Sequence, residues 1–158
     1  MSSSFQTFLA DEASTLAFGA SLANVSRGTT VIFLEGDLGA GKTTLARGFL
    51  RGLGYQDKVK SPTYTIVEPY EIAEQKLYHF DFYRLQGIQE LEYIGVQDYF
   101  VPGAIVLAEW PERGAGLLHE PDLSCYIVSQ ANGRDIRLVA NTPRGNEILK
   151  EFISKYGE

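Results

Sequence analysis

The stretch Gly36-Asp37-Leu38-Gly39-Ala40-Gly41-Lys42-Thr43 decides the expected fold, because it matches the pattern Gly-x-x-x-x-Gly-Lys-Thr at every fixed position. In this pattern the glycines let the backbone curl, so that successive amide hydrogens point at an anion. The lysine ammonium reaches the β- and γ-phosphates of a nucleotide, and the threonine hydroxyl ligates Mg²⁺. The sequence therefore predicts a phosphate-binding loop (P-loop) over residues 36–43, with Thr44 as a further nucleotide contact.

The segments on either side of the loop have the order that a P-loop requires. Residues 31–34 are uniformly apolar and lie between two glycines, which is typical of a strand buried on both faces of a parallel sheet. A helix is expected to begin near Lys42 and to end before Gly54, a suitable C-terminal cap. One face of that helix is apolar and consists of Leu45, Ala46, Phe49, Leu50 and Leu53.

The rest of the chain also divides into helices and strands. Asp11 is a good N-cap for a first helix, on which four small or apolar residues recur at helical spacing: Leu16, Ala17, Ala20 and Ala23. Residues 64–70 and 77–83 are rich in aromatic and β-branched residues. Because too few residues separate them for a crossover helix, we expect an antiparallel hairpin. Residues 89–94 indicate a short helix and residues 104–108 another buried strand.

The C-terminal third indicates a second hairpin and a last helix. Residues 124–130 and 134–139 flank Asn132-Gly133, a dipeptide that favours a two-residue turn because both residues tolerate positive φ. Thr142-Pro143 is expected to open a helix, whose inner face would consist of Ile148, Leu149, Phe152, Ile153 and Tyr156. The chain is thus predicted to be α/β, a P-loop NTPase-like three-layer sandwich with a mixed, partly antiparallel sheet flanked by helices. We expect residues 1–158 to form a single domain.

Composition limits the classes of function. The net charge of −6 opposes non-specific binding to nucleic acid, which depends on many lysine and arginine contacts to phosphates. The single cysteine, Cys125, can form neither an intrachain disulfide nor a multi-cysteine zinc site. No signal peptide or membrane-spanning segment is recognisable, so the expected location is cytoplasmic and no membrane contact is expected.

The base of the nucleotide follows from what the sequence lacks. The chain has no Asn-Lys-x-Asp segment, the signature that recognises guanine, and no Asp-x-x-Gly segment. Adenine is therefore the expected base, and ATP or ADP with Mg²⁺ the expected cofactors. Asp11, at a helix start, and Arg134, after the hairpin turn, are candidate contacts to the base side of the nucleotide.

Two acidic residues are candidates for the second metal-binding position of a P-loop site. Glu109 ends the apolar strand at residues 104–108, where the acid that serves Mg²⁺ is expected. We assign Glu109 to the metal, through water, and Asp81 to the attacking water or to the outer shell of the metal. The alternative for Asp81 is a surface ion pair with Arg84.

Other candidates lie beside these acids. Alternation along a strand predicts that His79, Asp81 and Tyr83 face one way, although a hydrogen-bonded structural role for His79 is at least as well supported as a catalytic one. Trp110 follows Glu109, where it could pack over the site and exclude water. Ser61-Pro62-Thr63 could be a switch-like segment that senses γ-phosphate or Mg²⁺, or a plain proline turn.

Four motifs together resemble one family, the small bacterial P-loop proteins called TsaE, formerly YjeE. They are Gly-Asp-Leu-Gly-Ala-Gly-Lys-Thr-Thr at 36–44, Ser-Pro-Thr-Tyr-Thr at 61–65, His-Phe-Asp-Phe-Tyr-Arg-Leu at 79–85 and Glu-Trp-Pro at 109–111. Their order and spacing resemble the family from near residue 5 to the end of the chain. The resemblance implies an ATPase of low activity alone, required for threonylcarbamoyl modification of adenosine in tRNA.

The resemblance also implies partners and residue roles. The partners would be the transferase proteins TsaB and TsaD, with tRNA contacted indirectly through that complex. Lys42 and the loop amides would bind phosphates, Thr43 and Glu109 would serve Mg²⁺, and Asp81 and Trp110 would matter to turnover. Two alternatives remain open at this stage: a small-molecule P-loop kinase, and a nucleotide-binding switch without useful hydrolysis.

Overall fold

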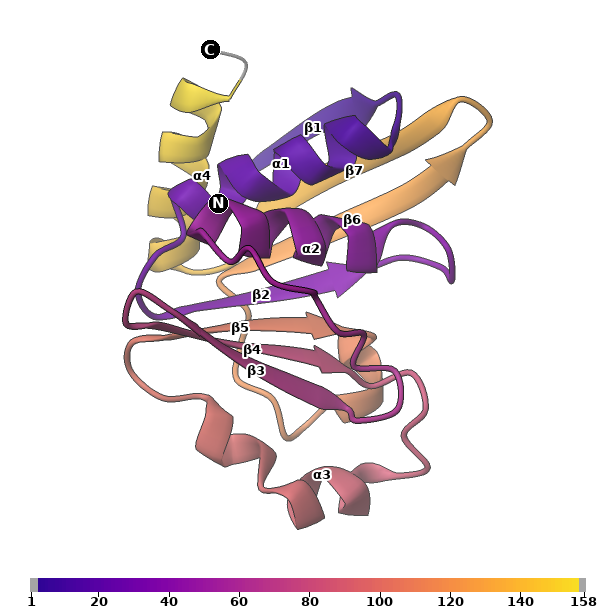
Figure 1. Cartoon of the computed structure of the whole chain (residues 1–158), viewed down its shortest axis with the longest axis vertical. Helices are drawn as coiled ribbons and strands as arrows, with labels where there is room; N and C mark the ends of the chain where they lie inside the picture. The colour runs from indigo at the N-terminus through magenta and orange to yellow at the C-terminus, as the bar shows by residue number, and fades with distance from the viewer. Residues whose placement is uncertain (1–2, 157–158) are drawn as a thin grey trace.

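A seven-stranded mixed sheet holds the P-loop near its centre (Figure 1). The computed structural model of the chain describes residues 3–156. The strand order is β1-β7-β6-β2-β5-β4-β3; β6, β2, β5 and β4 run parallel, while β7 and β3 are antiparallel to their neighbours. The strands are β1 (Ser4–Leu9), β2 (Thr30–Glu35), β3 (Val67–Ile72), β4 (Gln75–Asp81), β5 (Ala104–Glu109), β6 (Leu123–Gln130) and β7 (Gly133–Ala140).

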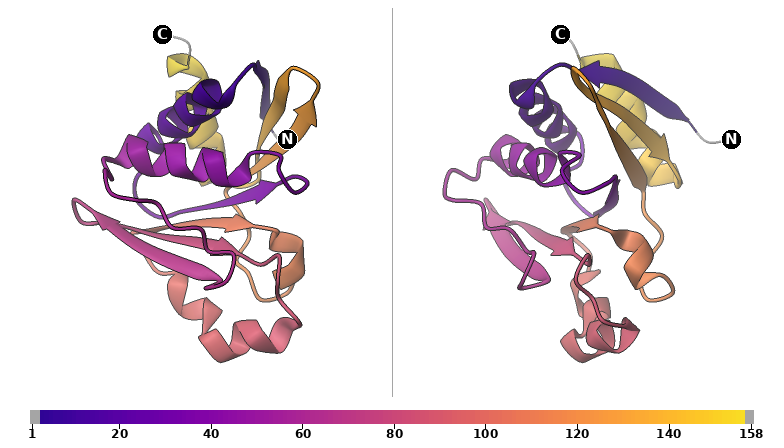
Figure 2. Two further views of the ribbon diagram at one scale, coloured as in Figure 1. Left: turned by 45° about the vertical axis from the view of Figure 1, so that its right-hand side comes forward. Right: turned by 90° about the vertical axis from the view of Figure 1, so that its right-hand side faces the viewer.

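Helices cover both faces of the sheet, as expected for a layered α/β fold. They are α1 (Glu12–Asn24), α2 (Lys42–Leu53), α3 (Ile88–Ile94) and α4 (Pro143–Lys155), with short 3₁₀ helices η1 (Val96–Tyr99) and η2 (Pro111–Gly114). Figure 2 shows α1 and α2 side by side along the sheet, and Figure 1 places α3 at the opposite end of the molecule. The mixed α/β sandwich predicted from the sequence is confirmed.

Strand alternation divides the core into two clusters. Ile32 and Leu107 point into a large cluster with α1, α2 and α4, in which the rings of Phe18 and Phe152 lie 5.1 Å apart. Val106 and its neighbours on the other face pack against α3, η1 and η2. The parallel strand β2 is covered on both sides by these clusters, which is why its residues 31–34 are continuously apolar.

The helices α1 and α2 pack unusually closely because glycines lie at their contact. A Cβ on Gly48 would overlap the carbonyl oxygen of Leu16 and lie 2.8 Å from its Cα, and a Cβ on Gly52 would lie 2.6 Å from Ala20 Cα. Of the four residues of α1 expected to recur at helical spacing, Ala23 is fully buried and Leu16 and Ala20 are half-buried, whereas Ala17 is exposed. Phe18 and Leu22 are fully buried as well.

Both hairpins are present, but the start of the first and the turn of the second differ from expectation. The first begins at Val67 rather than residue 64, and its turn residues Ala73 and Glu74 both have positive φ, as in a type I′ turn. In the second hairpin Gln130 pairs with Gly133, so the turn is Ala131-Asn132 and not Asn132-Gly133. Gly133 is instead needed for space, because a Cβ there would overlap the carbonyl oxygen of Leu9 in β1.

The ends of the first and last helices agree with the sequence. Asp11 caps α1 by accepting from Ser14 N at 2.8 Å, and Thr142 caps α4 by accepting from Gly145 N. The prediction that Ile153 lies on the inner face of α4 is wrong, because this residue is 47% exposed. Within residues 3–156, no helix is both long enough and apolar enough to cross a membrane.

The close contact between α1 and α2 leads to a stability prediction. Replacing glycine by alanine inside a helix normally stabilises the helix by about 1 kcal/mol. Gly48→Ala should nevertheless lower the free energy of unfolding by about 1–3 kcal/mol, because the added methyl group meets the backbone of α1. Urea denaturation followed by circular dichroism measures the change. Lys150→Ala, at an exposed position of α4, is the control, and a Gly48→Ala protein as stable as this control would contradict the packing argument.

Candidate nucleotide-binding site

The P-loop joins the end of β2 to the start of α2, as the sequence predicted. Gly39 and Gly41 have φ of +77° and +110°, a conformation that side-chain-bearing residues rarely adopt. The helix α2 begins at Lys42 with Gly41 as its N-cap, and no side chain accepts a hydrogen bond from its first amides. The amide hydrogens of its first turn are thus available to an anion, whose charge the helix dipole favours.

The start of α2, which carries these amides, lines a cleft of about 520 Å³. Its walls come from the loop, from the start of α2 and from the carboxyl ends of the neighbouring strands β4 and β5. The cleft therefore brings together most of the residues singled out from the sequence: Leu38, Gly39, Ala40, Gly41, Lys42, Thr43, Thr44, Thr63, Asp81, Tyr83, Arg84, Glu109, Trp110 and Arg134.

The ammonium group of Lys42 is held inside its own loop. Its side chain is only 5% exposed, and Nζ donates to the carbonyl oxygens of Gly36 and, at 3.0 Å, Asp37. It also lies 4.3 Å from the centre of the Trp110 ring. Burial lowers the pKa of Lys42, and the nearby carboxylates, with Glu109 foremost, oppose that shift. The two loop carbonyl groups thus stabilise the positive charge of Lys42 at the position where the ammonium could contact a phosphate.

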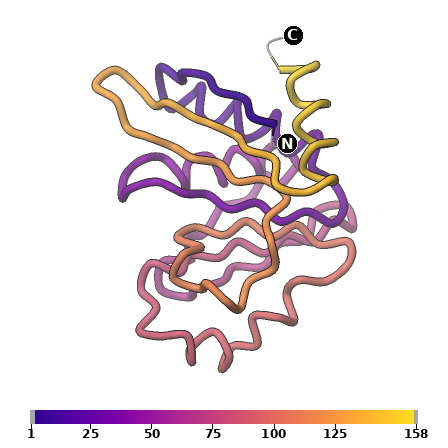
Figure 3. The backbone as a smooth tube through the Cα atoms, turned by 180° about the vertical axis from the view of Figure 1, so that it is seen from behind, coloured from indigo at the N-terminus to yellow at the C-terminus, as the bar shows by residue number. Residues whose placement is uncertain are grey.

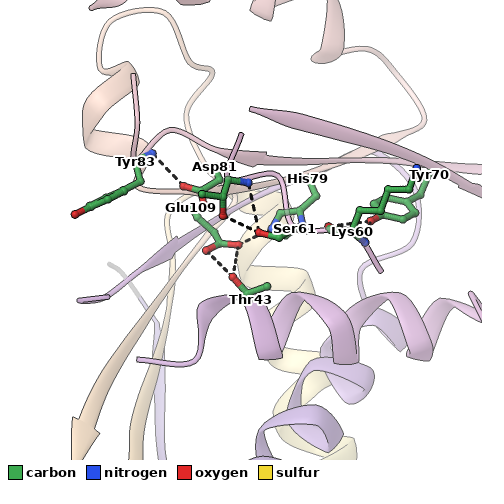
Figure 4. Close-up of polar contacts among 9 residues, drawn as sticks. Thr43, Lys60, Ser61, Tyr70, His79, Asp81, Tyr83 and Glu109 are labelled. Carbon is green, nitrogen blue, oxygen red and sulfur yellow. Dashed lines mark hydrogen bonds and ion pairs between the residues drawn. The ribbon is translucent and has the colours of Figure 1, made fainter. Parts of the chain in front are cut away.

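Thr43 and Glu109 face each other across the cleft (Figure 4). The Thr43 hydroxyl lies 3.2 Å from both carboxylate oxygens of Glu109. In the parallel pairing of β4 and β5, Asp81 is the register partner of Glu109, so the two acids come from adjacent strand ends. The structure therefore groups the hydroxyl and the two acids that the sequence proposed for magnesium and water.

Asp81 is buried, and one of its oxygens is held by the backbone. Tyr83 N donates to Asp81 Oδ1 at 3.0 Å. Burial raises the pKa of Asp81, the Tyr83 amide lowers it, and Glu109 raises it again. The alternative of a surface ion pair is wrong within residues 3–156, because Arg84 lies over the ring of Tyr64 at 4.6 Å instead of against Asp81.

His79 lies beneath the cleft rather than in it. Its imidazole is completely buried, and Nε2 lies 2.6 Å from Glu109 Oε2. The expected row of His79, Asp81 and Tyr83 on one strand face is only partly right, since β4 ends at Asp81. Tyr83 reaches the cleft from the loop beyond, where its ring packs 5.0 Å from that of Trp110.

Trp110 closes one side of the cleft in a strained backbone conformation. Its φ is +56°, in the left-handed region that residues with side chains seldom occupy. The guanidinium of Arg113 lies 5.7 Å from the Trp110 ring and 5.1 Å from the Tyr83 ring. Sequence reasoning missed Arg113, for which the only available signal was its place three residues after the tryptophan.

The Ser61-Pro62-Thr63 segment is anchored at both of its ends. The backbone of Lys60 exchanges hydrogen bonds with the hydroxyl of Tyr70. Farther along, Ile66 N donates to Pro62 O, and Asp81 N donates to Ile66 O. Thr63 lines the cleft and Pro62 is buried, whereas Ser61 is exposed and its hydroxyl lies 2.7 Å from that of Thr63.

Asp11 and Arg134 meet at a second, smaller pocket of about 240 Å³ beside the loop, which Gly41 and Thr44 also line. Arg134 has a structural role that the sequence did not suggest, because its Nε donates to the carbonyl oxygen of Ala40 at 2.7 Å. Figure 3 shows the tip of the β6–β7 hairpin on the same side of the molecule as the P-loop.

The residues present suit a magnesium nucleotide. Uncapped amides and a buried ammonium are donors for phosphate, and a hydroxyl beside a carboxylate supplies the hard oxygen ligands that Mg²⁺ prefers. Among residues 3–156, no group of three or more His, Cys, Asp or Glu side chains is arranged to hold a metal by itself. This agrees with a P-loop site, in which phosphate and water supply the remaining ligands.

Comparison with known proteins agrees with this geometry. The family described as "Threonylcarbamoyl adenosine biosynthesis protein TsaE" matches residues 9–136. A protein from Haemophilus influenzae named tRNA threonylcarbamoyladenosine biosynthesis protein TsaE is 46% identical over 154 residues, which cover 94% of this chain and 98% of that one. The protein of the same name from Bacillus subtilis is 42% identical over 130 residues, 80% of this chain and 78% of that one.

A solved structure shows the same fold. The crystal structure of YdiB from Bacillus subtilis superimposes with a TM-score of 0.81 and 29% identity, over 98% of this chain and 97% of that one. The match in sequence spans the P-loop, both acids and Trp110, and the match in structure spans nearly the whole sheet and its helices. On both grounds, this chain belongs to the TsaE family of proteins involved in tRNA threonylcarbamoyladenosine biosynthesis.

Proposed function

We propose that this protein binds ATP with Mg²⁺ at the P-loop cleft and hydrolyses it slowly, as the accessory ATPase of tRNA threonylcarbamoyladenosine synthesis. The observation that carries the proposal is the convergence of Lys42, Thr43, Glu109 and Asp81 on the uncapped start of α2. Its partners would be TsaB and TsaD, with tRNA contacted through their complex, in agreement with the acidic net charge of this chain.

The phosphate chain would lie along the start of α2. Lys42 would exchange its two loop carbonyl contacts for the β- and γ-phosphates, and the amides of the first turn would donate to the same oxygens. The second pocket, with Asp11 and Thr44, would hold the sugar and the adenine base. Arg134 supports this side of the site by fixing the carbonyl of Ala40.

Thr43 and Glu109 would hold Mg²⁺, Thr43 through its hydroxyl and Glu109 through water. The bound ion would neutralise the phosphate charge and orient the γ-phosphoryl group. Asp81 would accept a hydrogen bond from the attacking water, because its carboxylate lies beside Glu109 and one oxygen is already fixed by the Tyr83 amide. The rings of Trp110 and Tyr83 would keep bulk water away from that side of the cleft.

The proposal is tested by ATP turnover with and without the transferase proteins and tRNA. Slow release of phosphate alone and faster release with the partners is the expected result. Phosphate transferred to a small acceptor, with no response to the partners, would favour the kinase alternative. ATP binding that supports tRNA modification without any hydrolysis would favour the switch alternative.

Lys42→Ala should weaken binding of Mg²⁺–ATP by about 10- to 100-fold, because the charge-assisted contacts of the ammonium to the phosphates are lost. Trp110 is the single tryptophan and lines the cleft, so its fluorescence gives a direct binding titration. Lys76→Ala, an exposed lysine of β4, is the matched control. Unchanged affinity in Lys42→Ala would remove the phosphate site from this loop.

Glu109→Ala and Asp81→Ala should separate metal binding from turnover. Removing Glu109 should raise the Mg²⁺ concentration needed for ATP binding by about 10-fold or more. Removing Asp81 should slow hydrolysis by on the order of 100-fold while nucleotide affinity changes by at most about threefold. Phosphate release and fluorescence titration measure the two effects, with Glu120→Ala as an exposed acidic control. Equal losses of turnover and binding in Asp81→Ala would make it a structural or metal residue instead.

A further inference from the structure

The imidazole of His79 is the one buried polar group at this site that the proposed mechanism leaves without a task. It is completely buried and does not line the cleft, so it is exposed neither to the cleft nor to solvent. Its Nε2 lies 2.6 Å from Glu109 Oε2, and across residues 3–156 its Nδ1 has no hydrogen-bond partner. All of its polar contact is therefore with one oxygen of one carboxylate.

That carboxylate needs a fixed orientation. Glu109 is at the last position of β5, where its side chain leaves the sheet toward Thr43, and both of its oxygens lie 3.2 Å from the Thr43 hydroxyl. The symmetric distances show that Thr43 does not select one oxygen over the other. A carboxylate has about four lone-pair directions, and a donor on Oε2 fixes its plane and leaves Oε1 to face the cleft.

We infer that His79 is a positioning residue, which orients the Glu109 carboxylate toward magnesium by donating from Nε2 to Oε2. This inference rests on the proposed function, because it assigns Glu109 to the metal. Groups that hydrogen-bond to the residues around a metal commonly set metal affinity in this way, here by fixing the carboxylate before the ion and its water arrive. The pairing requires β4 and β5 to lie in parallel register, with His79 beside Leu107 and Asp81 beside Glu109.

The test replaces the donor and then restores it. His79→Leu keeps a bulky apolar side chain but removes the donor. His79→Gln places an amide nitrogen near the position of Nε2, and His79→Asn places one near Nδ1, too short to reach Glu109. The readout is the Mg²⁺ concentration at half-maximal ATP binding, followed by Trp110 fluorescence, together with ADP affinity in EDTA.

His79→Leu and His79→Asn should each raise the half-maximal Mg²⁺ concentration by about 10-fold or more, and His79→Gln should restore it to within about threefold. ADP affinity without metal should stay unchanged in all three variants. In a Glu109→Ala background, His79→Leu should add almost nothing, since the residue through which it acts is gone. His119→Leu, at the exposed second histidine, is the chemical control.

Several results would overturn the inference. A general packing role predicts equal losses in the Leu and Gln variants, or a further loss in the Glu109→Ala background. If His79→Leu does not fold, His79→Asn still decides, because a wild-type Mg²⁺ curve in that variant rejects the positioning role. Wild-type protein in which Mg²⁺ has no effect on ATP binding would instead reject the proposed function itself, so the two failures are distinguishable.

Discussion

The positive charge of Lys42 has to be kept stable inside the protein, and much of the site is arranged around that requirement. A buried ammonium without partners would be very costly. Here two carbonyl oxygens of the P-loop, the face of Trp110 and the carboxylates of Glu109 and Asp81 surround it. The proposed ATP phosphates would replace the two carbonyl contacts, while the acids would turn to metal and water. The groups that stabilise the ammonium are thus the ones that would receive the ligand, and they lie within one cleft at the carboxyl ends of β2, β4 and β5.

The parts of this arrangement that depend on local sequence could be predicted. The P-loop motif lies within eight consecutive residues, and the strand before it and the helix after it lie where they were expected. Glu109 could be placed at a strand end because the five residues before it are uniformly apolar. The caps Asp11 and Thr142 are equally local, since each accepts from an amide three residues later.

The features that could not be predicted depend on contacts between distant segments. The pairing of His79 with Glu109 follows from the register of two strands whose residues are 30 positions apart.

Gly133 was assigned to a turn, but its lack of a side chain serves the close approach of β1, which only the folded sheet reveals. The close packing of α1 on α2 was not predicted for a related reason: Gly48 and Gly52 bring α2 so near that Leu16 and Ala20 meet it through their backbone. Arg134 was proposed from its place after a turn, and its contact with Ala40 needed the hairpin to fold back over the loop.

The left-handed backbone of Trp110 has a consequence for how this protein can change. Holding a residue with a side chain at φ of +56° costs on the order of 1–3 kcal/mol, and Ile66, whose carbonyl accepts from Asp81 N, has a similar φ of +71°. Glycine at position 110 would relieve that cost, but it would also remove the ring that lies over Lys42 and beside Tyr83. The packing of this ring against the second core cluster therefore holds the left-handed backbone in place, so the turn after β5 and the aromatic wall of the cleft depend on each other. A substitution at position 110 would thus disturb the packing below the cleft and the wall of the cleft together.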